Sequence, residues 1–217
     1  VMDRCAPLAA IPTEVADALG LVTAVDVTAK ESLPPFANTA MDGFAVRSAD
    51  LSTIPARLQI IETIAAGHSP SRVIGQGEAS RIMTGAPIPD GADAIVMVEK
   101  TSVDGDTVSI ETQVEPGNHI RPAGDDVVEG DLVFPARTEL SAGHLGLLCS
   151  LGLREIETYP RLRVGVISTG DELVDDGGAL APGQIRDSNR RTLLSLLSGD
   201  GFEPVDLGLI ADDELAI

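Results

Sequence analysis

The hydrophobic pattern of the chain changes at about residue 160, and this change constrains the fold more than any other feature. Before it, short apolar segments alternate with Gly and Pro turns, as in β-rich proteins. After it, Leu162–Ile167 is an almost continuous apolar run, which is typical of a strand covered on both faces. A long loop over 170–186, a helix over about 189–197 and an apolar strand over Val205–Ile210 follow. This order predicts the start of an α/β domain with a parallel sheet.

The chain ahead of this point is divided by a Pro-Pro break at Pro34–Pro35. Pro12 suits the first turn of a helix and Gly20 its end, so we expect a helix over 13–19. Alternating apolar residues then predict a strand over Leu21–Val27. The break marks a candidate domain boundary.

Residues from Phe36 to about Val128 are expected to form a small β-rich domain, because turns separate many short apolar segments. A loop must fill 84–91, and Asp104–Gly105 is a hairpin signal between the last two strands. The expected strands in chain order are 58–65, 79–83, 94–98 and 107–112.

From Asp131 onward the pattern returns to that of the first residues, with short strands expected over Leu132–Pro135 and Ile156–Tyr159. Between them, Ser141 is a good N-cap for a helix that ends before Gly152. The predicted apolar face of this helix carries Leu145, Leu148 and Cys149.

Together the segments predict an α+β multidomain fold. Residues 1–33 and 130–160 would form one segmented α/β linker domain, interrupted by an inserted β-rich domain over 34–129. Residues 161–217 would begin an α/β parallel-sheet domain, with Asp212 and Asp213 opening a further helix. Because a covered parallel sheet of two strands is not expected to be stable alone, we expect the rest of this domain to lie outside the sequence.

The charge balance excludes several classes of partner. The 15 basic and 34 acidic residues give a formal charge of −19. Neither nucleic acid nor an anionic membrane is an expected partner, since binding to both needs a basic surface. Lysine is confined to Lys30 and Lys100, so an anionic substrate would need a divalent cation or local arginines to offset the repulsion.

Cys5 and Cys149 are far apart in sequence and form no CxxC pair, so neither a disulfide framework nor a zinc site is expected. Both lie among apolar residues and are predicted to be reduced core thiols. No apolar run reaches transmembrane length and no signal peptide is visible. The expected location is the cytoplasm.

The stretch Asn38–Arg47 joins a small acidic patch to the strand-like segment Phe44–Val46. Asp42 precedes Gly43, where the backbone can turn sharply or approach a ligand closely. Taken alone, an Asp-Gly pair before a strand is a turn. The stretch is also a candidate edge of an active site, if other motifs support it.

Ser168–Leu173 lies at the carboxyl end of the first predicted parallel strand, where open α/β sheets bind ligands. Its glycine lets the backbone turn, and its hydroxyls can bind phosphate oxygens. Its paired carboxylates, Asp171 and Glu172, can hold a hard cation such as Mg²⁺. A loop with a solvated Asp-Glu pair is the alternative.

In Gly183–Asn189, Asp187 or Ser188 would cap the helix that follows, and the free amides of that helix end attract anions. Plain capping is the alternative for Asp187. Thr84 ends a predicted strand and could offer its hydroxyl to a ligand or simply to a turn.

In Arg121–Asp126, Arg121 could contact an anion and Asp126 a metal, with a surface turn as the alternative. The three histidines show no ligand spacing and are read as structural. They are His68, His119 and His144.

Four of these motifs together resemble the molybdopterin molybdenumtransferase family, which is related to the C-terminal domain of gephyrin. They follow the family's order and spacing: Thr39–Val46, Arg81–Pro89, Ala123–Asp126 and Ser168–Leu173. The resemblance runs along nearly the whole chain. It implies a segmented elongated domain, an inserted β-rich domain, an α/β molybdopterin-binding domain and a C-terminal β-barrel.

The resemblance also implies a function, which is the insertion of molybdate into adenylylated molybdopterin with release of AMP and with Mg²⁺ as cofactor. This is the last step of molybdenum cofactor synthesis. The active cleft would form in a homodimer, between the α/β domain of one subunit and the β-rich domain of the other. The molybdopterin adenylyltransferase upstream in the pathway is a further partner that the resemblance suggests.

Carried over by motif, the positions implicated in activity are Asp42, Thr84, Asp126 and Glu172. The resemblance assigns Asp171 and Glu172 to the metal and pyrophosphate end, and Asp42 and Thr84 to the opposing wall. The residues expected to bind the cofactor are Ser168, Thr169, Gly170, Asp187, Ser188 and Asn189.

The family's molybdopterin-binding loop, further acidic and basic contacts and the C-terminal barrel would lie beyond Ile217. The sequence is therefore expected to be a truncated member of the family that is inactive alone. The alternatives are a gephyrin-like scaffold that binds a protein partner, and a paralogue that inserts tungsten or has lost its activity.

Overall fold

The computed structural model describes residue 6 and residues 8–212, and the chain falls into two compact units. Unit 1 comprises 1–26, 135–148 and 154–217, and unit 2 comprises 27–134 and 149–153. Strands dominate both units, helices are few, and antiparallel and parallel pairs both occur. The chain thus has the predicted α+β multidomain fold.

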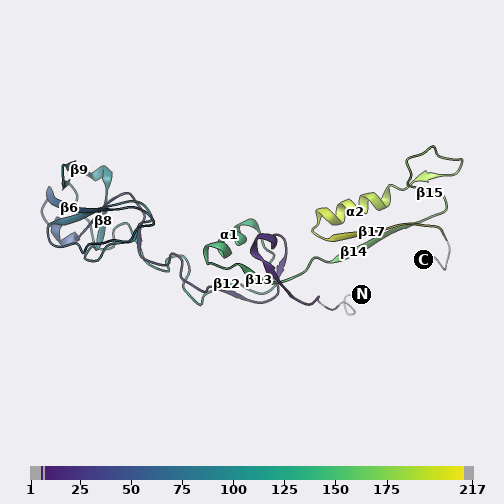
Figure 1. The fold of residues 1–217 in the computed structure, drawn as a ribbon, viewed down its shortest axis with the longest axis horizontal. Coiled ribbons are helices and arrows are strands. Elements are labelled where there is room, and N and C mark those ends of the chain that lie inside the picture. The colour runs from purple at the N-terminus through teal and green to yellow at the C-terminus, as the bar shows by residue number, and fades with distance from the viewer. Residues whose placement is uncertain (1–5, 7, 213–217) are drawn as a thin grey trace. The chain divides into compact units, whose positions relative to one another are not determined.

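Unit 2 is built on a six-stranded sheet with the order β8-β5-β7-β6-β10-β9. Figure 1 labels β6, β8 and β9 of this sheet. Neighbouring strands are antiparallel except β6 and β7, which run parallel. The six strands are β5 (Gly43–Val46), β6 (Ala56–Ile64), β7 (Glu78–Ile82), β8 (Ala94–Met97), β9 (Thr101–Asp104) and β10 (Thr107–Ile110). The predicted strands of the β-rich region are therefore confirmed, within a few residues at their ends.

Two short antiparallel pairs complete the strands of unit 2. β4 (Asn38–Thr39) pairs with β11 (Ile120–Arg121), and β3 (Val27–Thr28) pairs with β12 (Leu132–Phe134). Two 3-10 turns, Ser48–Leu51 and Val98–Lys100, follow β5 and β8.

Both faces of β5 are buried, which explains why Phe44–Val46 is apolar without alternation. Phe44 and Val46 pack in one core cluster with Leu58, and Ala45 packs in a second cluster with Ile95. All three residues of this segment are fully buried. The stretch that carries Asp42 therefore leads directly into the best-covered strand of the sheet.

Unit 1 contains a three-stranded antiparallel sheet, β1-β13-β2, formed by Ile11–Glu14, Glu155–Tyr159 and Val22–Thr23. The helix α1 (Ala142–Ser150) begins as predicted, since Ser141 Oγ accepts the N–H of His144 at 3.4 Å. Gly152 ends it with a φ of 70°.

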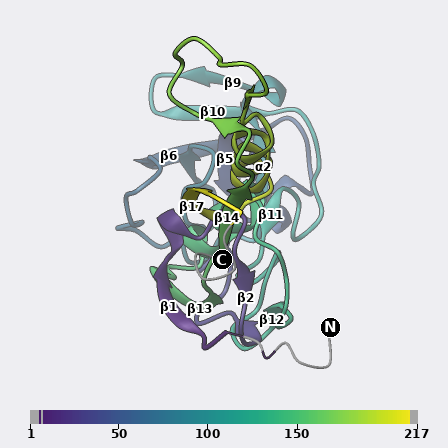
Figure 2. The ribbon, with the colours of Figure 1, turned by 90° about the vertical axis from the view of Figure 1, so that its right-hand side faces the viewer.

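The C-terminal part of unit 1 has the predicted strand-loop-helix-strand order. β14 (Arg163–Thr169) and β17 (Glu203–Ile210) pair in parallel, and α2 (Asn189–Gly199) packs along both, as Figures 1 and 2 show. The connecting loop contains a short parallel pair, β15 (Leu173–Val174) with β16 (Ile185–Arg186). Within the described chain Leu207 remains 56% exposed, so the residues described do not supply coverage of both faces.

The predicted helix over 13–19 is wrong. Residues 11–14 form β1, and Val15–Asp17 forms only a 3-10 turn. β1 pairs with β13, and the hydroxyls of Thr13 and Thr158 lie 2.7 Å apart in a hydrogen bond. A helix this short has little stability of its own, and strand pairing therefore prevails.

Three further predictions needed correction. The expected strand over 21–27 is two short strands, β2 and β3, and the strand before the Asp104–Gly105 hairpin is β9 rather than β8. Cys149 is exposed, because Leu148 is the buried residue of α1 and successive helix positions lie about 100° apart. Cys5 and Asp213 lie outside the described residues.

Among the described residues, α1 and α2 are both too short to cross a membrane.

Candidate functional site

Asp42 lies between β4 and β5, and Thr84 holds one of its carboxylate oxygens. The hydroxyl and the main-chain N–H of Thr84 both donate to Asp42 Oδ1, at 2.6 and 2.7 Å. These two bonds, the hydroxyl's first, lower the pKa of Asp42 below its ordinary value. Both residues are exposed, so an ionised carboxylate of fixed orientation faces solvent.

Three motifs that are far apart in the sequence meet at β4. The main chain of Thr39 accepts the N–H of Gly85 at 2.9 Å and donates to the carbonyl of Ala86 at 3.1 Å. On its other edge β4 pairs with β11, which places Arg121 opposite Asn38. The loop that carries Thr84 and the segment that leads to Asp126 are therefore both fixed to the strand that precedes Asp42.

Asp126 is held in an ion pair with Arg121. Arg121 Nη2 donates to Asp126 Oδ1 at 2.7 Å, and its Nε donates to Asp125 Oδ2 at 3.1 Å. The bond to Asp126, then that to Asp125, raises the pKa of Arg121 above its ordinary value. The side chains of this group are 39–52% exposed, which leaves them accessible to a ligand.

A glycine is required at position 43 because the backbone of the neighbouring strand β8 lies too close for a side chain. A Cβ at this position would lie 2.0 Å from the carbonyl oxygen of Val96 in β8. The sequence left open whether the backbone turns here or approaches a ligand. The structure shows that the close approach is between β5 and β8.

The second group of predicted site residues lies at the end of β14. Gly170 is buried with a φ of 152°, and a Cβ there would lie 2.7 Å from Glu172 Oε2. Glycine thus makes room for the side chain of Glu172. Asp171 Oδ1 accepts the N–H of Asp212 at 3.2 Å. Asp171 and Glu172 are both exposed.

Asp187 is buried at the start of α2. Its Oδ1 accepts the hydroxyl of Ser168 at 3.1 Å and the N–H of Arg190 at 3.2 Å, and its Oδ2 accepts Arg190 Nε at 2.8 Å. The bond from the Arg190 side chain is the main reason why the pKa of Asp187 is lowered. These contacts favour the capping interpretation of Asp187, since Ser188 makes no side-chain capping bond within the described chain.

Two regions of the chain match known protein families. Residues 2–152 match the family described as "MoeA N-terminal region (domain I and II)". The chain belongs to the MoeA family. Residues 165–217 match a second family description, "Probable molybdopterin binding domain".

Curated relatives extend this result. "Molybdopterin molybdenumtransferase 2" of Mycobacterium tuberculosis is 43% identical over 217 residues, which cover 98% of this chain and 53% of that protein. "Molybdopterin molybdenumtransferase" of Haemophilus influenzae is 41% identical over 199 residues, which cover 91% of this chain and 49% of that protein. The chain spans about half the length of the curated relatives it matches.

Solved structures agree in fold. A molybdopterin biosynthesis MoeA protein from Pyrococcus horikoshii is 30% identical with a TM-score of 0.87, covering 96% of this chain and 57% of that one. A second structure of a molybdopterin biosynthesis MoeA protein from this organism is 31% identical with a TM-score of 0.81, covering 97% of this chain and 55% of that one.

The predicted site residues divide between the two matched family regions. Asp42, Thr84 and Asp126 lie in the MoeA N-terminal region, and residues 168–189 lie in the probable molybdopterin-binding domain. The structure brings Asp42 and Thr84 into direct contact and ties both to the segment of Asp126 through β4. Within unit 1 it joins Ser168 to Asp187.

The carboxylates of this MoeA-family chain fit one mode of magnesium binding. In the part of the chain that the structure describes, no group of three or more His, Cys, Asp or Glu side chains could hold a metal ion. Mg²⁺, however, is commonly bound through one or two carboxylates together with substrate phosphates and water. The adjacent and exposed carboxylates of Asp171 and Glu172 fit that mode.

No sequence motif predicted a role for Arg190, which is only 3% exposed, or for its partners Asp175 and Asp206. A signal was present, because Arg190 occupies the same helix stripe as Leu194 and Leu197, both of them partly buried. A charged residue in an otherwise apolar stripe needs buried partners.

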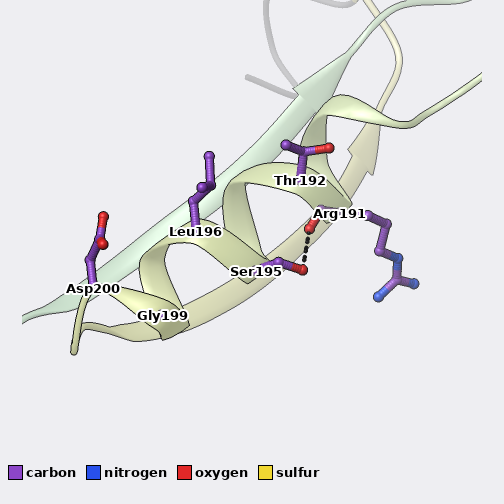
Figure 3. Close-up of a pocket in the computed structure, with 6 residues that line it drawn as sticks. All are labelled: Arg191, Thr192, Ser195, Leu196, Gly199 and Asp200. Atoms are coloured by element: carbon purple, nitrogen blue, oxygen red, sulfur yellow. Dashed lines mark hydrogen bonds between the residues drawn. The ribbon is translucent and has the colours of Figure 1, made fainter.

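The face of α2 away from Arg190 carries an open hollow of about 600 Å³, shown in Figure 3. Ser195 Oγ donates to the carbonyl of Arg191 at 2.9 Å within the helix. The hollow is lined by Arg191, Thr192, Ser195, Leu196, Gly199 and Asp200. None of the predicted site residues belongs to it.

Proposed function

We propose that the whole protein is a molybdopterin molybdenumtransferase, which inserts molybdate into adenylylated molybdopterin and releases AMP in molybdenum cofactor biosynthesis. The observation that carries the proposal is the succession of two family regions, 2–152 and 165–217, along one chain. The curated relatives that bear this enzyme name are up to 43% identical over almost all of the chain.

Asp42 and Thr84 form one wall of the proposed active site, with Asp126 beside them. Thr84 fixes Asp42 Oδ1 and lowers the pKa of Asp42, which extends the ionised state of the carboxylate to lower pH. An oriented carboxylate can accept hydrogen bonds from N–H groups such as those of a pterin, and so hold the substrate in a reactive position.

The loop after β14 forms the phosphate end of the proposed site. Asp171 and Glu172 would hold Mg²⁺, which neutralises charge on phosphoryl oxygens and on an incoming anion when it is bound. The hydroxyl of Thr169 donates to phosphate oxygens, and Gly170 lets the backbone approach closely. The hydroxyl of Ser168 donates to Asp187, so Ser168 contributes to this end by its position and as an acceptor. Ser188 and Asn189 present the free amides of the α2 N-terminus to an anion. Asp187 stabilises the phosphate end of the proposed site indirectly, because it caps the start of α2.

We propose further that the enzyme is a cytoplasmic homodimer, with Asp42 of one subunit and Glu172 of the other contributing to the same active site. The proposed domains are a segmented domain over 1–33 and 130–160, an inserted β-rich domain over 34–129 and a molybdopterin-binding domain that begins at 161. The molybdopterin adenylyltransferase that supplies the substrate is a proposed partner.

The scaffold alternative has less support, since the relatives named above carry the transferase name. No observation on this chain favours tungstate over molybdate.

Complementation tests the proposed function. The full-length gene is introduced into a bacterium that lacks its own molybdopterin molybdenumtransferase, and the activity of a molybdenum enzyme is measured. The intact gene should restore that activity and the Asp42→Ala version should not. Restoration by neither version, with both proteins expressed, would contradict the proposed function, and restoration by both would contradict the role of Asp42.

A further inference from the structure

Arg190 places a charge on the core-facing stripe of α2. Its side chain is 3% exposed, and Leu194 and Leu197 follow it on the same face. Burial of a guanidinium costs free energy unless its charge is paired and its N–H groups are hydrogen-bonded. The role of Arg190 therefore depends on the residues that pair with its guanidinium.

Three carboxylates from three different elements surround this guanidinium. Arg190 Nε donates to Asp187 Oδ2 at 2.8 Å, Nη1 donates to Asp206 Oδ1, and Nη2 donates to Asp175 Oδ2. Asp187 opens α2, Asp206 lies within β17, and Asp175 follows β15. The planar guanidinium of Arg190 thus links a helix, a strand and a loop. The ammonium of a lysine could not make these links with the same geometry.

Arg190 and its three partners Asp175, Asp187 and Asp206 are called the Arg190 node here. The node contacts both ends of the loop that carries the proposed metal ligands. At its start, Ser168 Oγ donates to Asp187 Oδ1 at 3.1 Å. At its end, Asp187 N donates to the carbonyl of Val174 at 3.0 Å, and Ile185 N donates to the carbonyl of Glu172 at 2.8 Å. Loss of the node would free the segment that presents Glu172.

Asp206 fixes the neighbouring strand at the same point. Its Oδ1 also accepts the N–H of Gly208 at 2.9 Å, and Gly208 has a φ of 86°. This turn coincides with the register shift between Val166 and Ser168 in the pairing of β14 with β17. The position of Ser168 therefore depends on a bulge that Asp206 helps to shape.

We propose that Arg190 is a positioning residue for the proposed reaction. By tying Asp175, Asp187 and Asp206 together, it fixes the loop that presents Asp171 and Glu172. The inference rests on the proposed function for its catalytic part. Arg190 is buried among its partners, so it acts through the loop and not on the substrate.

The test compares three variants of the full-length protein by hydrogen exchange and by the kinetics of AMP release from adenylylated molybdopterin. Asp175→Asn removes the negative charge of one Arg190 partner, which also pairs with Arg191 at 3.7 Å. Its side chain is 37% exposed, so the variant should fold. Arg190→Lys keeps the charge but places its donors on a single nitrogen, which cannot reach the three carboxylates with the geometry of the guanidinium. Asp176→Asn is the matched control, because Asp176 bonds only to the nearby Gly178 N among the contacts described.

Asp175→Asn should speed exchange of the amides in 170–186 by about tenfold, since local opening becomes easier. Its kcat should fall by about tenfold with a smaller change in KM, since a misplaced loop weakens the reactive geometry. Arg190→Lys should change both quantities in the same direction, and Asp176→Asn should change neither.

Unchanged exchange in both Asp175→Asn and Arg190→Lys would overturn the proposal. So would faster exchange with unaltered kcat, or a lower kcat with unaltered exchange, which would mean direct action on the substrate. If the unmodified protein released no AMP, the proposed function would fail, and the exchange data alone would still decide whether Arg190 holds the loop.

Discussion

At the scale of single residues, the carboxylates of Asp42 and Glu172 in the proposed site are held in place by different contacts. Asp42 is fixed by two hydrogen bonds from Thr84, and these bonds keep its pKa low. Glu172 instead lies over Gly170, where a Cβ would lie 2.7 Å from its carboxylate oxygen. The Thr84 hydroxyl therefore orients Asp42 and lowers its pKa, and the glycine leaves the Glu172 side chain undisplaced.

Removal of that hydroxyl should be visible in the pH dependence of activity. In the full-length protein, Thr84→Val deletes the larger of the two contributions that lower the pKa of Asp42. The acid limb of the pH–rate profile should then move to higher pH, because the carboxylate protonates more easily. AMP release is measured from pH 4 to 8. The control is Thr53→Val, which makes the same change at an exposed threonine that belongs to none of the predicted site motifs. An unmoved acid limb would show that this carboxylate does not govern the reaction.

At the scale of elements, the contact between β5 and β8 leaves no room for a side chain at Gly43, where a Cβ would lie 2.0 Å from the Val96 carbonyl oxygen. The turn before β5 and the strand itself are thus fixed by one close backbone approach. The loop that holds Asp42 ends at this contact.

Gly43→Ala should therefore destabilise unit 2 by about 1–3 kcal/mol, the usual cost of overpacking a core. Gly146→Ala is the control, because its Cβ would meet nothing within 4 Å and alanine favours the helix by about 0.5–1 kcal/mol. Urea unfolding followed by circular dichroism measures both. An equally stable Gly43→Ala variant would mean that β5 and β8 can separate without loss.

The Arg190 node predicts acid sensitivity of the C-terminal part of unit 1. Hydrogen bonds from Arg190 are the largest cause of the lowered pKa values of Asp187 and Asp206. A lowered pKa in the folded state adds stability above the ordinary value of about 3.9, and that stability is lost as pH falls below it. NMR signals of β17 should thus hold from pH 7 to about 5 and weaken below about 4.

In the Asp206→Asn variant this loss on acidification should be smaller, since one of the two titrating partners is gone. Signals of β17 that persist unchanged to pH 2.5 would contradict the assignment of the node as a stabilising contact.

The elements that the sequence predicted well are those with strong local signals. The apolar runs of β8, β14 and β17, the Asp104–Gly105 hairpin and the capped helix α1 were all expected. The helix over 13–19 failed, because pairing of β1 with residues more than 140 positions away overrode the local pattern. Long-range pairing of this kind cannot be read from a single short segment.

The candidate site shows the same division. Asp42, Thr84, Asp126 and Glu172 came from motifs. The bonds between Asp42 and Thr84 and between Asp126 and Arg121 needed the structure. Arg190 was missed since its importance lies in three partners from separate elements. Motif spacing gives candidate residues, and only the fold shows which carboxylates are free and which are engaged.

At the scale of the whole molecule, the proposed site draws on both units, Asp42 and Thr84 from one and the Glu172 loop from the other. The proposed homodimer combines them across subunits. This arrangement makes a prediction that a site within one subunit does not make.

Two inactive full-length variants, Asp42→Asn and Glu172→Gln, should restore activity when their subunits are mixed. Half of the dimers are then mixed, and one of the two sites in each is intact, so about a quarter of the wild-type activity should return. Mixing is done by unfolding and refolding together, and each variant refolded alone is the control. No recovery, with dimers present, would place both residues of a site in one subunit.

The most direct test of the central claim is molybdate-dependent release of AMP from adenylylated molybdopterin by the full-length protein. Release should require both molybdate and Mg²⁺. The rate should be at least about tenfold lower in Glu172→Gln, whose melting temperature should stay near that of the wild type because the side chain is exposed. No release by the wild-type protein, or an unchanged rate in Glu172→Gln, would contradict that claim.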